Sequence, residues 1–429
     1  MMTIPTQNRR GWLRGIAGLT LGGVGLAAPM RAAAAGAEAG ASGIWDSLAA
    51  QYDVAPDFIN LENAYYGIMA TPVADDFKRN IDYLNRRNSH YLRGQFDRAG
   101  IEAIRATLAA HAGVAAAEIA ITRGATESLQ NLIANYRPLK AGETVIVGNL
   151  DYDNVVDAMN DLARRRGATV ATVRIPEPAT RQAVLDTYEQ ALRQHPRARL
   201  LLLTHISHRT GLVIPVAEIV AMAKRRNVDV IVDIAQSWGQ LDFRIPDLGA
   251  DFVGANLHKW IGAPLGQGFL YIRESRLQDI DIQLGNTNFP ATDIRARVHA
   301  GTVNAAAIMT IPAALAFHGQ IPLSERAARL RALRDYWVRR VLDVSGVQIL
   351  TPEEPGMYGA VTSFRVRGKT GFDDNVALAR RLMDEHGIFT VPRSGPAGGA
   401  CIRVTPAFFT RTADLDKLVA AIRLLAAKA

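Results

Sequence analysis

An acid and a lysine stand directly after two apolar runs of the sequence. Asp233 ends the run 228–233, and Lys259 follows the run 252–254 within the segment Asn256-Leu257-His258-Lys259-Trp260. A carboxylate at the end of a buried strand is costly unless it is paired, and a pyridinium N–H is one productive partner. A lysine among His, Trp and small residues can have a lowered pKa and act as an imine-forming amine. Each residue alone could also be structural, as a helix cap, a salt bridge or a surface lysine.

A turn of small residues offers a third chemical function. The residues Arg123-Gly124-Ala125-Thr126 follow the apolar run 118–122 and precede a helical pattern. A helix N-terminus presents free backbone N–H groups and the positive end of the helix dipole, which suit a phosphate group. Gly-x-Thr alone is also an ordinary loop. The cradle, the acid and the lysine together have the order and spacing expected for pyridoxal 5′-phosphate (PLP), which needs a phosphate site, a protonated ring nitrogen and a lysine Schiff base.

These segments belong to a pattern of alternating strands and helices. Apolar runs, several without polar alternation, predict buried strands at 118–122, 144–148, 169–173, 199–204, 228–233, 252–256 and 268–272. Helical patterns between and after them cover 126–136, 154–165, 181–194, 216–226, 324–342, 374–386 and 412–427, with further strands near 361–366 and 401–404. The sequence therefore predicts an α/β fold. A large, mostly parallel sheet is expected in a domain of residues 44–320, and a smaller α+β domain in residues 321–429. Sites in such sheets lie at the carboxyl ends of the strands.

Composition excludes several other classes of protein. Of 429 residues, 48% are hydrophobic and 21% charged, so wholesale disorder is excluded. The formal net charge is +8, but four of the positive charges lie in the first 34 residues, which contain no acid; without them the charge is +4. A nucleic-acid partner is therefore not expected. The single cysteine, Cys401, excludes an intrachain disulfide and a multi-cysteine zinc site, and no metal site is expected.

The N-terminus has the features of an export signal. Residues 8–14 read Asn-Arg-Arg-Gly-Trp-Leu-Arg, an uncharged, Gly-rich stretch covers 15–28, and alanines occupy 32–35. This order predicts a signal peptide over residues 1–35, and Arg9 and Arg10 resemble the twin-arginine motif. Fourteen residues at ~1.5 Å each cannot cross a hydrocarbon core of ~30 Å, so no stable membrane insertion is expected. A periplasmic protein, exported folded by the twin-arginine machinery, is predicted; a disordered basic tail is the alternative.

Four stretches resemble the class V aminotransferase family of fold type I PLP enzymes, especially its isopenicillin N epimerase-like branch. They are Ile59-Asn60-Leu61-Glu62-Asn63-Ala64-Tyr65-Tyr66-Gly67, Thr122-Arg123-Gly124-Ala125-Thr126-Glu127, Val232-Asp233-Ile234-Ala235-Gln236-Ser237-Trp238-Gly239 and Asn256-Leu257-His258-Lys259-Trp260. The resemblance implies that Lys259 forms the Schiff base, Asp233 pairs with the ring nitrogen and Gln236 hydrogen-bonds the ring hydroxyl. It also implies a homodimer with shared active sites.

The resemblance assigns further contacts. Tyr152 would stack on the cofactor ring, and Arg403 matches an arginine that clamps a substrate carboxylate. Tyr66 and Asn88, the latter in the polar stretch 85–91, are further candidate substrate contacts. The implied phosphate contacts are Gly124, Ala125, Thr126, Asn256, His258 and, from the neighbouring subunit, Thr302.

Two departures from the family pattern bear on the reaction. His208 stands where many relatives carry an Asn that faces the ring hydroxyl, so it is a candidate catalytic residue beside Lys259 and Asp233; a structural histidine is the alternative. Cysteine desulfurases of the superfamily carry a nucleophilic Cys shortly after Arg-x-Gly. Here Arg393-Ser394-Gly395 has none, and Cys401 falls in a predicted strand, so thiolate-based desulfuration is not expected.

These features predict an exported PLP enzyme that acts on the amino group or Cα of an amino acid, or of a secreted peptide or siderophore. Exported PLP enzymes of pyoverdine tailoring are similar. Aminotransferase-like chemistry ranks first, because Lys259 and Arg403 suffice for it. Epimerisation, elimination and O2-dependent oxidation are alternatives within the class, and a non-catalytic binding protein of the same fold is an alternative outside it.

Replacing both arginines of the signal tests the predicted export route. Arg9→Lys with Arg10→Lys keeps the charge but removes the twin-arginine pattern, so we expect the precursor to stay in the cytoplasm, as measured by cell fractionation and immunoblotting. Arg14→Lys is the matched control, because it leaves the pair intact. If the double variant still reaches the periplasm, the twin-arginine interpretation is wrong, and an ordinary secretory signal or a basic tail takes its place.

Overall fold

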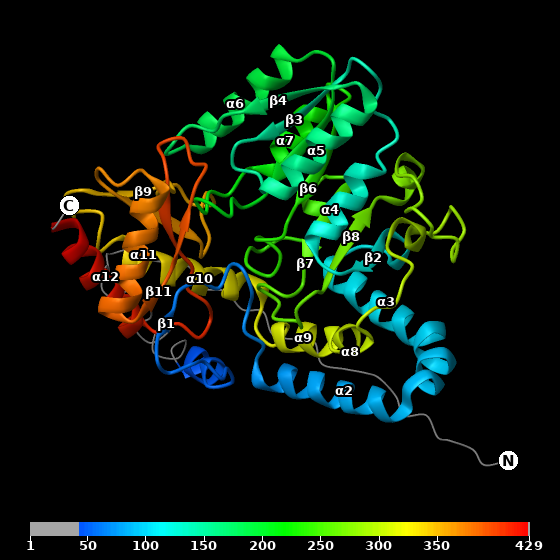
Figure 1. Cartoon of the computed structure of the whole chain (residues 1–429), viewed down its shortest axis with the longest axis horizontal. Helices are drawn as coiled ribbons and strands as arrows, with labels where there is room; N and C mark the ends of the chain where they lie inside the picture. Colours follow the sequence, from blue (N-terminus) through cyan, green and yellow to red (C-terminus); the bar gives the residue numbers. More distant parts are fainter. Residues whose placement is uncertain (1–42, 428–429) are drawn as a thin grey trace, which may run out of the picture. The chain divides into compact units, whose positions relative to one another are not determined.

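The computed structural model describes residues 43–427. The predicted signal peptide lies outside the described residues. The described residues from 46 onward belong to one compact unit, so the predicted boundary at residue 320 stays a prediction. Within the described part of the chain, the fold is built on a seven-stranded and a four-stranded sheet (Figure 1). A short parallel pair, β1 (Ile59–Asn60) with β11 (Ile388–Phe389), ties the N-terminal segment to the C-terminal part of the chain.

The seven-stranded sheet confirms the α/β prediction. Every neighbouring pair is parallel except those of β8, which runs antiparallel to β2 and β7. All its strands lie within one residue of their expected bounds. In spatial order they are β2 (Ile119–Thr122), β8 (Gly268–Ile272), β7 (Phe252–Asn256), β6 (Asp229–Asp233), β5 (Ala198–Thr204), β3 (Thr144–Gly148) and β4 (Thr169–Val173).

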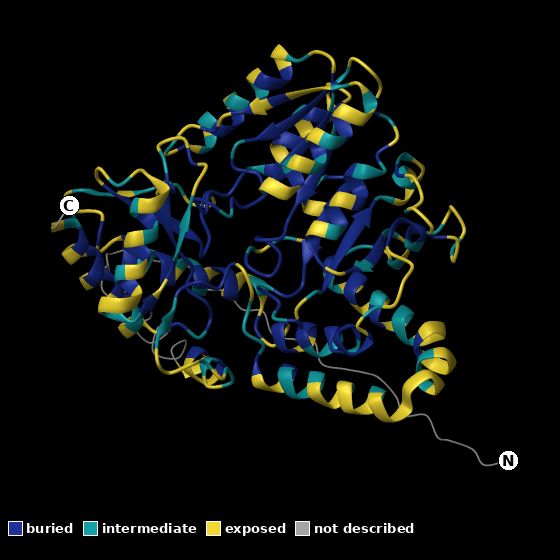
Figure 2. Ribbon diagram, in the orientation of Figure 1, coloured by how far each residue is buried: buried dark blue, intermediate teal, exposed yellow. Residues whose placement is uncertain are grey.

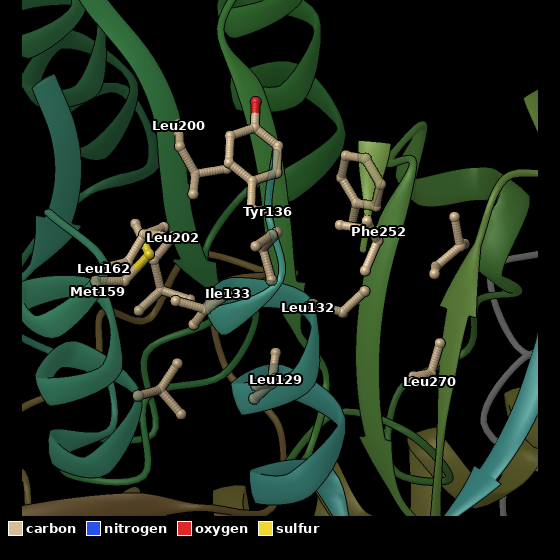
Figure 3. Packing of buried hydrophobic residues seen from close by; sticks show 14 of the residues in the cluster. Leu129, Leu132, Ile133, Tyr136, Met159, Leu162, Leu200, Leu202, Phe252 and Leu270 are labelled. Atoms are coloured by element: carbon tan, nitrogen blue, oxygen red, sulfur yellow. The ribbon is translucent and has the colours of Figure 1, made fainter. Parts of the chain in front are cut away.

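Helices bury the strands, which explains their apolar runs. Strands β7 and β8 are buried along their whole length, as expected for strands covered on both faces. Helix α4 (Ala125–Ala134) and helix α5 (Asp153–Arg166) pack their apolar residues against one face of the sheet (Figure 3). The labelled members of this core are Leu129, Leu132, Ile133, Tyr136, Met159, Leu162, Leu200, Leu202, Phe252 and Leu270. Helices α6 (Arg181–Gln194) and α7 (Val216–Lys224) complete the alternating pattern.

The C-terminal part contains an antiparallel sheet with its own core. The strands are, in spatial order, β12 (Val391–Arg393), β13 (Cys401–Val404), β10 (Thr362–Val366) and β9 (Val347–Ile349). The accompanying helices are α10 (Leu323–Val338), α11 (Phe372–His386) and α12 (Thr412–Ala427). Trp337, Phe364 and Ile402 are fully buried in the core between this sheet and its helices. The predicted α+β character of this segment is thus observed.

The N-terminal helices were not expected from the sequence. Helix α2 (Thr71–Tyr91) buries only Val73 and is otherwise largely exposed (Figure 2), so it lacks the apolar stripe by which helices are recognised. A π-helical stretch (Leu92–Gly100) and helix α3 (Ile101–Ala112) follow, and α8 (Ala305–Met309) and α9 (Ile311–His318) contact α2. Short 3-10 turns cover Ala116–Glu118, Ile245–Leu248, Glu274–Asp279 and Ile294–Arg297. Among the residues described, no single helix has the length and apolarity to cross a membrane; one bent pair, α8–α9 with α10, meets the criteria jointly.

Candidate active site

A cavity of about 550 Å³ lies at the carboxyl ends of the large sheet's strands. Strands β6 and β7 are parallel neighbours, so Asp233 at the end of β6 and Asn256 at the end of β7 reach the same edge. Most residues predicted for the site meet here. Those that line the cavity are Tyr66, Gly124, Ala125, Thr126, Tyr152, His208, Asp233, Gln236, Asn256, His258, Lys259 and Arg403.

The Lys259 amine is enclosed by the walls of this cavity. Desolvation lowers its pKa to about 8, the Asp233 carboxylate partly offsets this, and the positive charge of Arg403 adds to it. Among the described residues, no hydrogen bond or ion pair engages the amine. The neutral fraction near neutral pH is therefore larger than for an exposed lysine, and the neutral amine is the form that attacks an aldehyde.

Asp233 is buried opposite this lysine. One carboxylate oxygen accepts a hydrogen bond from the Ala235 N–H at 2.8 Å, which fixes the orientation of the group. Burial raises the pKa of Asp233, while the Ala235 N–H and the Lys259 charge act in the opposite direction. A cationic N–H donor at this carboxylate would relieve the cost of its burial. A protonated pyridine nitrogen is such a donor.

The turn before α4 forms a narrow cradle. Gly124 has φ +135°, and a Cβ at this position would lie 3.1 Å from Asn256 Oδ1, so a side chain would be strained and crowded there. Asn256 Oδ1 accepts a hydrogen bond from the Ala125 N–H at 2.7 Å and thus caps the helix. The following N–H groups of the first turn are left for an anion.

His258 lines the same cavity as a neutral ring. Burial lowers the pKa of His258 to about 4, and its Nδ1 lies 3.0 Å from the Gln267 carbonyl, which fixes the orientation of the ring.

Tyr152 and His208 form another part of the cavity wall. Their rings meet edge to face, with centroids 5.3 Å apart. Burial and the neighbouring Arg209 hold the pKa of His208 well below its usual range, so the imidazole is neutral. Its Nδ1 is buried without a partner among the described residues. This orphaned atom suits a hydrogen bond to a bound group, and its catalytic role stays a prediction.

Gln236 is more constrained than the sequence suggested. Its amide nitrogen donates to the Ala64 carbonyl at 2.7 Å, and its oxygen accepts from the Trp260 indole at 3.3 Å. The side chain therefore joins the N-terminal segment to the lysine segment. The predicted bond from Gln236 to a ring hydroxyl would have to use its remaining N–H.

Two predicted contacts are not brought to the cavity of their own chain. Asn88 does not line it, since it lies near the exposed end of α2, at a kink with φ 45°. Thr302 is also absent from the lining. Because Thr302 was assigned to the neighbouring subunit, a single chain leaves that assignment a prediction.

Arg403 reaches the cavity, but not as a free guanidinium. It is 1% exposed, forms an ion pair with the buried Glu62, and donates from Nη1 to the His208 carbonyl at 2.7 Å. Neither Glu62 nor Arg393, another arginine of the lining, was assigned a role from the sequence. Glu62 is 341 residues away from its partner, so no local pattern could reveal the pair.

Gly67 packs directly against the backbone of the lysine segment. Its N–H donates to the His258 carbonyl at 2.9 Å, and a Cβ on Gly67 would lie 1.9 Å from the Lys259 carbonyl oxygen. The segment 64–67 thus lies over Lys259 at a distance that only glycine permits. The sequence offered a clue to Gly67, because this residue ends the stretch 59–67 that resembles the family.

Comparison with known proteins agrees with this geometry. The profile of the family described as aminotransferase class-V matches residues 74–410. The chain belongs to this family. It is 26% identical over 406 residues to the isopenicillin N epimerase of Amycolatopsis lactamdurans, covering 89% of this chain and 98% of that one. It is 29% identical to the cysteine desulfurase of Cronobacter sakazakii, over 71% of this chain and 77% of the relative.

A solved structure confirms the fold. The apo cysteine desulfurase of Thermococcus onnurineus superposes with a TM-score of 0.77 at 20% identity, over 89% of this chain and 98% of the other. Membership of the family implies a PLP cofactor. The residues present fit that group: an uncommitted amine on Lys259, a buried acid at Asp233, an orphaned His208 Nδ1 and the Gly124 cradle surround one cavity.

Filling the space at Gly67 should damage the site. Gly67→Ala forces its Cβ against the Lys259 carbonyl, so we expect a loss of about 1–3 kcal/mol in the free energy of unfolding and at least a tenfold weaker PLP affinity. Urea denaturation and absorbance titration with PLP measure the two effects. Gly94→Ala is the control, because a Cβ there meets nothing within 4 Å. Equal behaviour of both variants would contradict the close approach.

Proposed function

We propose that this protein is a PLP-dependent enzyme that acts on the amino group and Cα of an amino acid, free or peptide-linked, with aminotransferase-like chemistry. The observation that carries the proposal is the Lys259 amine, with a pKa lowered to about 8, opposite the buried Asp233 in one cavity. An uncommitted amine and a buried acid in this arrangement match what the cofactor of the family requires.

Each residue has a defined task in this proposal. Bound PLP would supply an electron sink that acidifies the substrate Cα–H. Asp233 would keep the ring nitrogen protonated, and the first turn of α4 with Thr126 would bind the phosphate. Lys259 would hold the cofactor through its aldehyde carbon and would also carry the proton of the substrate Cα, as a base with a lowered pKa. Tyr152 and the neutral His208 would orient the ring.

Epimerisation is the second candidate, and specific observations favour it. Two relatives are isopenicillin N epimerases, at 26% and 27% identity. Epimerisation needs a second acid or base facing Lys259 across the substrate, and Tyr152 and His208 line the cavity together. O2-dependent oxidation needs no further residue and is a third outcome. Desulfuration through a thiolate has no support, because Cys401 is buried and its pKa is raised to about 11.

We also propose a location and an assembly. The twin-arginine-like pattern at Arg9 and Arg10 supports export of the folded holoenzyme to the periplasm, where a secreted peptide or siderophore would be the substrate. A homodimer that brings Thr302 to the neighbouring cavity would complete the phosphate site.

Cofactor trapping combined with an activity panel tests this function. Protein mixed with PLP should turn yellow, and borohydride should bleach the band and add the cofactor's mass to the peptide that carries Lys259. Lys259→Ala should still bind PLP but lose turnover by several orders of magnitude, since the amine and the proton carrier disappear together. Amino acids and peptides, with and without air, are then scored for keto product, inverted stereocentre, ammonia and peroxide.

The outcomes separate the candidates. Keto product formed with an amino acceptor supports transamination, inverted stereocentres support the epimerase, and oxygen-dependent peroxide supports the oxidase. Protein that stays colourless with PLP would contradict the proposed function as a whole. A stable chromophore without turnover on any substrate would favour a binding protein of this fold.

A further inference from the structure

Large apolar side chains are exposed at the mouth of the cavity. The polar side chains expected to meet the cofactor are buried, with Asp233 and Asn256 only 4% and 7% exposed. Four other lining residues are 44–58% exposed, and all four are aromatic or aliphatic: Tyr65, Tyr66, Leu265 and Phe372. We call these four residues the apolar rim. Single exposed apolar side chains are ordinary, but several that converge on one cavity indicate a binding surface.

The apolar rim is assembled from three segments that are far apart in the sequence. The two tyrosines follow β1, Leu265 lies in the turn between β7 and β8, and Phe372 is the first residue of α11. Leu265 stands between Ala263 and Gln267, which are 1% and 3% exposed, so the turn directs this one side chain outward. Because only the folded chain brings these segments to one opening, no local run of apolar residues accounts for the rim.

The backbone that carries the two tyrosines is fixed on both sides. The Tyr65 N–H donates to Glu62 Oε1 at 3.1 Å, and the Ala64 carbonyl accepts a hydrogen bond from the Gln236 amide at 2.7 Å. Gly67, which follows the tyrosines, packs against the lysine segment. Aromatic rings on a fixed backbone offer contact area at a low cost in conformational entropy.

The two tyrosines form one aromatic surface that continues into the cavity. Their ring centroids lie 4.1 Å apart with an interplanar angle of 43°, and the Tyr66 ring lies 5.8 Å from the ring of His258. A hydrogen bond between the two tyrosine side chains raises the pKa of Tyr66 and engages their hydroxyl groups with each other. Aromatic pairs of this kind favour a further aromatic ring over an aliphatic chain of the same area.

We propose that the apolar rim is a substrate subsite that binds an aromatic ring. The cofactor and the reacting amino group would occupy the buried polar part of the cavity, and the ring would lie at its mouth. This inference rests on the proposed function and narrows its substrate class. The substrate is an amino compound that carries an aromatic group beyond the reacting amine, rather than a small free amino acid.

Two aminooxy probes test the subsite on the PLP-loaded protein. O-benzylhydroxylamine carries an aromatic ring and O-methylhydroxylamine only a methyl group. In both, the nitrogen forms the C=N bond to the aldehyde carbon of PLP, and the Lys259 nitrogen leaves as a free amine. Decay of the absorbance band of bound PLP at several probe concentrations gives a half-saturating concentration and a limiting rate. The benzyl probe should half-saturate at an about ten- to thirtyfold lower concentration with a similar limiting rate, because the ring contributes to binding and not to bond exchange.

This preference for the benzyl probe should depend on the apolar rim. Leu265→Ala with Phe372→Ala should reduce it about three- to tenfold, because apolar area and an aromatic contact are lost together. Both side chains are exposed, so their removal leaves the folded protein intact. Leu424→Ala with Phe389→Ala is the matched control, since these residues are 51% and 39% exposed and lie outside the cavity lining.

Ligand-detected NMR gives a readout that needs no reaction. Saturation transferred from the protein to the ring protons of benzyl alcohol reports binding of the same aromatic group, with or without PLP. We expect a signal with the wild type that falls at least about threefold in the rim variant and is unchanged in the control variant.

The possible failures are distinguishable. Equal half-saturating concentrations for the two probes in the wild type, or a preference that survives in the rim variant, overturn this inference and leave the proposed function intact. A rim variant whose molar mass in light scattering differs from that of the wild type, with an unchanged preference, shows that a second copy of the chain covers the rim, which also overturns the inference. Wild-type protein that forms no band with PLP contradicts the proposed function, and the benzyl alcohol signal then tests the rim on its own.

Discussion

Removing the Lys259 amine from water is the constraint on which the rest of the site depends. Desolvation disfavours the charged ammonium form. The pKa of Lys259 is therefore lowered to about 8, and no ion pair engages the amine among the described residues. Gly67 packs against the backbone carbonyl of Lys259, and the Asp233 carboxylate partly offsets the lowering of the pKa. The cofactor site is therefore a consequence of how three distant segments of chain enclose one amine.

Charge pairing connects this enclosure to the two sheets. Glu62, from the N-terminal segment, neutralises Arg403 of the small sheet, and Arg209 of the large-sheet side pairs with Asp153 and with the Ser394 carbonyl. These buried contacts cross between segments that meet only in the folded chain. Arg393, another arginine of the cavity lining, has a buried Nε without a hydrogen-bond partner among the described residues. Packing and electrostatics around the cavity thus rest on the same few side chains.

The parts of this arrangement that could be predicted follow from chain order. Strands buried on both faces appear as apolar runs, and parallel neighbours bring the residues after each strand, such as Asp233 and Lys259, to one edge. The pairing of Glu62 with Arg403 could not be predicted, because it joins residues 341 positions apart. Helix α2 was missed because only Val73 is buried along it, and Asn88 therefore lies on an exposed helix rather than at the cavity.

The pKa of Lys259 in the apoprotein is the most direct test of this account. Competitive acetylation across a range of pH, quantified at the Lys259 peptide by mass spectrometry, gives the value, with exposed lysines of the same protein as internal references. Only the neutral amine reacts, so labelling of Lys259 should rise with pH with a midpoint near 8. A midpoint near 10.5, the ordinary value for lysine, would contradict a desolvated amine and with it the proposed site.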